Sequence, residues 1–89
     1  MRFNLDAGQH KFVADFEPDG KGSFSGSISS PEYGEGKISG LITGDHYIGT
    51  ATLDGHSAKF DATIANGSIT GTIKAGWFFS LTFFGKEAA

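Results

Sequence analysis

The stretch ISGLITGDHYIGTA, residues 38–51, decides the fold. It holds two runs in which apolar and polar residues alternate, and alternation with a period of two is typical of a half-buried β-strand. The Gly-Asp pair at 44–45 between the runs suits the II′ turn of a tight hairpin. With the turn there, Gly40 faces Gly49, and the apolar and small residues of both strands share one face.

The same pattern continues on both sides of this hairpin. Asp-Gly at 54–55 and Asn-Gly at 66–67 are strong hairpin signals, because both central residues of a type I′ turn need positive φ. The first of these turns places Gly49 opposite Phe60, so the same face again collects apolar and small residues. A slip of one residue in the pairing would move a strand's core residues to the outer face and expose them to water. Because all three turns give the same buried face, they fix the register.

The predicted strands span residues 2–6, 10–16, 23–29, 37–43, 46–53, 56–65, 68–74 and 77–84. The predicted connections are residues 7–8, 18–22, 31–36, 44–45, 54–55, 66–67 and 74–76.

These segments predict an all-β fold in which residues 1–89 form a single small domain, an eight-stranded antiparallel up-and-down β-barrel. Closure requires the last strand to pair with the first, which removes the exposed edges of a flat sheet. Small mid-strand residues allow sharp bends and leave room inside the barrel. They are Gly26, Gly40, Gly49, Gly71, Ala14 and Ala62. The larger residues predicted to fill the lumen are Phe12, Phe16, Phe24, Tyr47, Phe60, Trp77, Phe79, Leu81 and Phe83. We therefore expect a packed interior.

Composition narrows the classes of function. The chain has 89 residues, no cysteine and a formal net charge of −3, so it forms no disulfide and no thiolate metal site. Its lysine and arginine residues are scattered, which argues against a nucleic-acid partner. No apolar run approaches the roughly 20 residues of a membrane span, so direct membrane insertion is not expected. The start, MRFNLDAGQH, lacks the layout of a signal peptide. We expect a cytoplasmic protein if Met1 is the native start, and a cell-surface or periplasmic one if the domain is excised from a lipoprotein.

The residues that could carry chemistry fall in turns or at strand starts. His10, His46 and His56 each begin a predicted strand, and no HxH or HExxH spacing occurs. Most carboxylates lie in turns, where aspartate has a conformational role. No serine stands in GxSxG, and the glycine-rich stretches match no phosphate-binding motif. The sequence therefore predicts a non-enzymatic protein with no metal and no cofactor.

Several apolar residues are out of phase with the buried face of their strands. Leu41 and Ile48 point outward in the predicted register, and the turn at 44–45 places them directly opposite each other. Val13 also points outward. A paired or aromatic exposed patch indicates a partner surface or a homodimer contact. The candidate partner-binding residues are Leu41, Ile48, Tyr33, Asp45, His46, Phe78 and Phe84.

A short strand repeat carries a family resemblance. It reads apolar, any, small, any, apolar, as in FSGSI (24–28), ISGLI (38–42), YIGTA (47–51) and ITGTI (69–73). Over roughly residues 12–73 the chain resembles the small eight-stranded barrels of transferrin-binding protein B and related Gram-negative surface lipoproteins. The resemblance implies the barrel fold and protein binding through loops and the barrel exterior. The C-terminal GWFFSLTFFG differs from the family's Phe-Tyr-Gly-Pro closing stretch, so the family's transferrin-contacting residues are not transferred.

Together these features predict a protein-binding module whose partner is another protein. The predicted contact surface is the Leu41 and Ile48 pair with the turn at 44–46 and the loop around Tyr33, which is expected to lie beside them. An alternative of the same class is a small phage- or plasmid-encoded inhibitor or immunity protein, which an acidic face would suit. A second alternative is a calycin-like carrier of a small ligand, which requires a cavity. A structural domain of a larger assembly is also consistent with the sequence.

Overall fold

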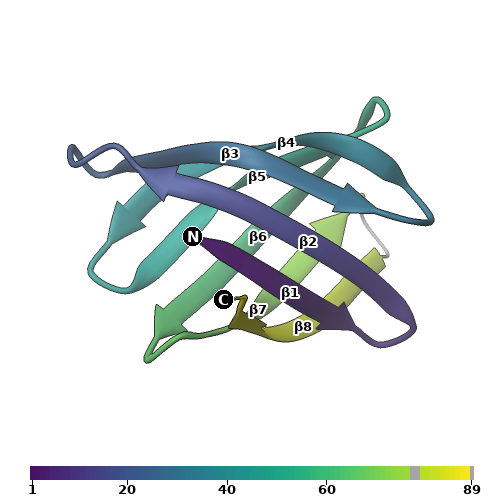
Figure 1. Cartoon of the computed structure of the whole chain (residues 1–89). Helices are drawn as coiled ribbons and strands as arrows, with labels where there is room; N and C mark the ends of the chain where they lie inside the picture. The colour runs from purple at the N-terminus through teal and green to yellow at the C-terminus, as the bar shows by residue number, and fades with distance from the viewer. Residues whose placement is uncertain (77–78, 89) are drawn as a thin grey trace.

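The chain forms a closed antiparallel barrel in the order β1-β2-β3-β4-β5-β6-β7-β8 (Figure 1). The computed structural model describes residues 1–76 and 79–88, and only the backbone of residue 79. The strands are β1 (Arg2–Ala7), β2 (His10–Pro18), β3 (Ser23–Ser30), β4 (Gly34–Thr43), β5 (His46–Leu53), β6 (His56–Ala65), β7 (Ser68–Ala75) and β8 (Phe79–Glu87). Residues Phe3–Asp6 of β1 pair with β8, which confirms the predicted closure.

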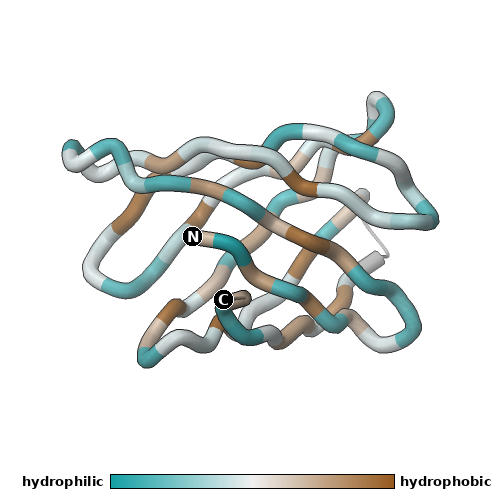
Figure 2. The backbone as a smooth tube through the Cα atoms, in the orientation of Figure 1, coloured by the Kyte–Doolittle hydropathy of each residue, from teal (hydrophilic) through white to brown (hydrophobic). Residues whose placement is uncertain are grey.

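The lumen holds the apolar core. Apolar and polar residues alternate along the strands (Figure 2), and every second side chain points inward. The buried apolar residues are Phe3, Leu5, Ala7, Phe12, Ala14, Phe16, Phe24, Ile28, Ile38, Tyr47, Ala51, Phe60, Ala62, Ile69 and Phe83. Leu81 is half-buried and packs against them. Trp77 and the side chain of Phe79, both predicted to point inward, lie outside the described residues.

All three hairpin registers predicted from the turns are confirmed. Gly40 lies opposite Gly49, and Gly49 lies opposite Phe60 on its other side. Across the 66–67 turn, Ile64 lies opposite Ile69. The Asp-Gly and Asn-Gly turns have positive φ at both positions, with 49° at Asp54 and 55° at Asn66. The local turn chemistry and the apolar pattern therefore specify the same pairing.

The strand bounds differ from the prediction mainly at β4, at β8 and at the first turn, and by one or two residues at the ends of β2, β3 and β7. β4 already begins at Gly34, so the loop predicted over 31–36 is only a turn at residues 31–33. β8 continues to Glu87 because its last residues pair with both β1 and β7. The first turn is Gly8-Gln9 rather than residues 7–8, since Ala7 pairs with His10.

Glycines mark the places where neighbouring strands approach most closely. At Gly26, Gly36, Gly40, Gly49, Gly71 and Gly85 an added Cβ would collide with backbone atoms of the adjacent strand. At Gly40, for example, it would lie 2.6 Å from the Cα of Gly49 and still closer to the carbonyl oxygen of Ile48. The sequence predicts four of these positions as barrel bends and misses Gly36 and Gly85, which lie toward strand ends.

The β2–β3 loop is ordered by its own aspartate. Asp19 Oδ1 accepts backbone N–H bonds from Lys21, at 2.6 Å, and from Ser23, at 3.1 Å. These bonds stabilise the carboxylate and hold the pKa of Asp19 below its usual value. The aspartate therefore has a turn-forming role, as the sequence suggests.

The lumen is filled by side chains. The cavity among its described lining residues has a volume of about 20 Å³, little more than the space that one water molecule needs. Large and small residues alternate across the strands, as with Phe60 opposite Gly49 and Tyr47 opposite Ala62. This agrees with the packed interior expected from the sequence.

Candidate partner-binding surface

Leu41 on β4 and Ile48 on β5 form an exposed apolar pair on the outside of the barrel. They lie directly opposite each other in the β4–β5 ladder. Leu41 is 66% exposed and Ile48 is 51% exposed. Because side chains alternate between the two faces of a strand, the inward-facing Gly40 and Gly49 oblige these two neighbours to face solvent. We call Leu41 and Ile48 the β4–β5 apolar pair.

Polar residues surround the β4–β5 apolar pair. Ser23 of β3 lies opposite Leu41, and Asp61 of β6 lies opposite Ile48. The imidazole Nε2 of His46 contacts the Asp61 carboxylate beside Ile48. Both partners are exposed, so this pair contributes at most about 1 kcal/mol to stability. An apolar centre with a polar rim is the usual layout of a protein interface.

The β4–β5 turn lies at one end of this surface. Asp45 is in the turn, and its backbone carbonyl oxygen accepts the N–H of Ile64 at 2.9 Å, which ties the turn to β6. His46 begins β5 directly after it. The structure thus brings four predicted residues together: Leu41, Ile48, Asp45 and His46.

Tyr33 does not belong to this surface, and its predicted place beside the β4–β5 turn is wrong. It lies in the β3–β4 turn, at the other end of β4. Ten residues of extended chain separate the two turns, which corresponds to about 30 Å. Tyr33 instead stacks on Phe12, with ring centroids 6.0 Å apart, and its hydroxyl is 3.4 Å from His10 Nδ1.

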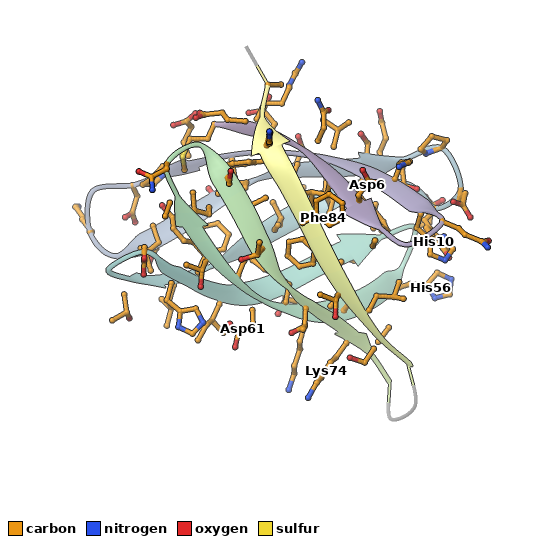
Figure 3. All side chains as sticks on the ribbon, turned by 90° about the horizontal axis from the view of Figure 1, so that it is seen from below. Asp6, His10, His56, Asp61, Lys74 and Phe84 are labelled. Atoms are coloured by element: carbon orange, nitrogen blue, oxygen red, sulfur yellow. The ribbon has the colours of Figure 1, made fainter. Side chains whose placement is uncertain are left out.

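Phe84 is a second exposed apolar residue, on a different part of the barrel. It is 62% exposed and lies between Asp6 of β1 and Thr70 of β7 (Figure 3). β6 and β7 separate its strand from β5 in the barrel order, so Phe84 and the β4–β5 apolar pair do not form one patch. Phe78 lies outside the described residues.

The sequence does not predict an open hollow where β2 and β3 separate. The β2–β3 pairing ends at Val13 and Ser29, and Pro31, two residues on, has no N–H to extend the ladder. The hollow has a volume of about 540 Å³. Its lining residues are Asn4, Leu5, Asp6, Lys11, Phe12, Val13, Ser29, Ser30, Pro31, Gly34 and Glu35. A proline at the end of a predicted strand is the sequence signal that could have located it.

The histidines lie at two ends of the barrel. His46 follows the β4–β5 turn, whereas His10 and His56 begin β2 and β6 at the opposite end. The carboxylate of Glu32 lies 3.1 Å from His10 Nδ1. Within residues 1–76 and 79–88, no three histidine or acidic side chains are grouped so that they could hold a metal ion.

The same residues contain no helix long and apolar enough to cross a membrane.

No family model, curated protein or solved structure gives a significant match to this chain. The resemblance to the barrels of transferrin-binding protein B therefore stays a prediction.

Proposed function

We propose that this protein is a non-enzymatic protein-binding module that contacts its partner through the β4–β5 apolar pair. The observation that carries the proposal is the exposure of two aliphatic side chains, Leu41 and Ile48, directly opposite each other on adjacent strands. Single exposed apolar residues are common on protein surfaces, whereas adjacent ones form a patch that a partner can cover.

Burial of this pair would supply useful binding energy. Complete burial of a leucine or isoleucine side chain contributes about 1.5–3 kcal/mol. Leu41 and Ile48 are already partly covered, at 66% and 51% exposure, so a partner would gain roughly 2–3 kcal/mol from the two together. Since about 1.4 kcal/mol is a factor of ten in affinity, the pair would change Kd by more than tenfold.

The packed lumen favours binding by the outside of the barrel over a carrier function. A drug-sized ligand occupies a pocket of about 300–1,000 Å³, and the cavity in the described lumen measures about 20 Å³. A carrier function would have to use the open hollow of about 540 Å³ beside β2 and β3 instead of the lumen. A small inhibitor or immunity protein would use the same kind of outer surface, so both of these functions depend on a protein partner.

We expect Leu41→Thr with Ile48→Thr to weaken partner binding at least tenfold while the barrel stays folded. Threonine has the β-branched shape that strands favour and removes apolar surface. The partner is captured from a lysate of the source cells on immobilised protein and identified by mass spectrometry. Its Kd is then measured by calorimetry for the native chain and for the double variant.

A matched control uses the next outward-facing pair along the same strands, Ser39 and Thr50. Ser39→Ala with Thr50→Ala should leave the affinity within about twofold, because polar rim residues contribute little. Equal affinity of the native chain and the threonine double variant would contradict the proposal. A sharp fall in melting temperature of the double variant would mean that Leu41 and Ile48 support the fold instead. An assay of the purified partner's own activity then shows whether binding inhibits it.

A further inference from the structure

The open hollow beside β2 and β3 contains a stretch of backbone that has lost its neighbouring strand. After Val13 and Ser29, the next pair in the ladder would be Lys11 and Pro31, but the β2–β3 pairing ends before it. Pro31 has no N–H to donate to the ladder. Lys11 and Pro31 both line the hollow, so the ligand-accessible space begins where the ladder stops.

The hydrogen-bond phase of β2 shows which way the backbone of Lys11 faces. Met1 and Phe16 exchange two backbone bonds of 2.9 Å, so the even-numbered residues of β2 bond to β1. The odd-numbered residues bond to β3, and Asp19, just past the strand, continues this phase with an N–H bond of 2.9 Å to the Ser23 carbonyl oxygen. The N–H and C=O of Lys11 therefore face the hollow. In the described part of the chain, no backbone group pairs with them there.

The β3–β4 turn closes one end of the hollow. Tyr33 stacks on Phe12 with ring centroids 6.0 Å apart, and the Glu32 carboxylate lies 3.1 Å from His10 Nδ1. These contacts hold the turn against the start of β2, although β2 and β3 no longer pair there. The hollow of about 540 Å³ is within the usual range of small-ligand pockets, about 300–1,000 Å³.

The walls of the hollow combine apolar surface with a few polar groups. Val13 and Pro31 supply exposed apolar surface. The ionisable side chains among the lining residues are Asp6, Lys11 and Glu35. The Lys11 ammonium pairs with Asp6, whereas Glu35 forms no ion pair among the described residues. Two carboxylates against one ammonium disfavour an anionic ligand.

We propose that the hollow binds a flat heterocycle without negative charge, in which a ring N–H lies beside a ring nitrogen acceptor. The ligand N–H bonds to the Lys11 carbonyl oxygen, and the ligand nitrogen accepts the Lys11 N–H. This arrangement repeats the two-bond pairing of an antiparallel ladder, with the ring against Val13 and Pro31. The site uses no residue of the β4–β5 apolar pair, so it can fail while the proposed function stands.

7-Azaindole and indole are matched probes, because they share a shape and a ring N–H and differ in the acceptor nitrogen. Titration of the isotope-labelled chain followed by NMR measures each Kd and locates the site. 7-Azaindole should shift the backbone amides of Lys11 and Val13 and bind tighter than indole by about fivefold or more. 7-Azaindole-3-carboxylate should bind more weakly than 7-azaindole.

Three results of the titration overturn the proposal. The first is equal affinity for 7-azaindole and indole. The second is tighter binding of the carboxylate, which would assign recognition to the Lys11 ammonium. The third is the absence of shifts around the hollow at the solubility limit of 7-azaindole.

Two pairs of variants test the site independently of the probes. Lys11→Pro removes the N–H that faces the hollow and that β1 does not use, whereas Lys11→Ala keeps it. Ser29→Trp fills the hollow, whereas Ser27→Trp places the same side chain at the next outward position of β3, outside the lining.

Lys11→Pro and Ser29→Trp should each weaken 7-azaindole binding by about fivefold or more, and their two controls should stay within about twofold of the native chain. Circular dichroism checks that each variant is folded, and Ser29→Trp decides if Lys11→Pro does not fold. Native affinity in a folded Lys11→Pro or Ser29→Trp variant overturns the proposal.

Discussion

Gly40→Ala is expected to lower the free energy of unfolding by about 3 kcal/mol or more, the upper part of the range for overpacking. The added Cβ would lie 2.6 Å from the Cα of Gly49 and would collide with the Ile48 carbonyl oxygen. Both obstacles are backbone atoms of β5, so no rotamer change relieves the clash. Chemical denaturation of the native chain and the variant measures the difference in stability.

A second glycine separates this clash from the effect of conformation. Gly44, in the β4–β5 turn, has φ of +62° and no atom within 4 Å of an added Cβ. Gly44→Ala should therefore cost only the strain of a left-handed residue, about 1–2 kcal/mol. Equal stability of the Gly40→Ala and Gly44→Ala variants would contradict the close approach of β4 and β5 at Gly40.

Phe83→Ala is expected to cost about 3–5 kcal/mol, as usual for a buried phenylalanine. The side chain is 2% exposed and points into the lumen opposite Gly71. Its removal leaves a cavity that the surrounding hydrogen-bonded strands close only in part. Thermal or urea unfolding followed by circular dichroism measures the loss.

The adjacent Phe84 supplies the matched control, because the same residue type follows on the same strand. Phe84 is 62% exposed, so Phe84→Ala should change stability by no more than roughly 0.5–1 kcal/mol. Similar losses for the two variants, or a larger loss for Phe84→Ala, would contradict the inward and outward assignment of β8.

The part of the fold that depends on short-range signals could be predicted from the sequence. The Asp-Gly and Asn-Gly turns each fix a two-residue connection, and alternation fixes the face, so pairs such as Leu41 with Ile48 follow directly. The start of β4 was harder to locate. Its first residues, Gly34 and Gly36, have no side chain to contribute to an alternating pattern, so the prediction placed them in a loop.

The misplacement of Tyr33 has a different cause. In an up-and-down barrel, successive turns alternate between the two ends, so the β3–β4 and β4–β5 turns cannot be neighbours. The predicted topology already implied this separation. The hollow beside Val13 was not predictable from alternation, because it results from the loss of pairing between β2 and β3 after Ser29.

The central claim, that the partner covers the outside of the barrel at the β4–β5 apolar pair, is tested most directly by methyl NMR with the purified partner. A soluble paramagnetic probe broadens solvent-exposed methyl groups. We predict that the Leu41 and Ile48 methyl signals shift on binding and become protected from the probe, while those of the buried Ile38 and Ile69 change little. Unchanged Leu41 and Ile48 signals, with shifts at Val13 in the hollow or at the lumen isoleucines instead, would contradict the claim.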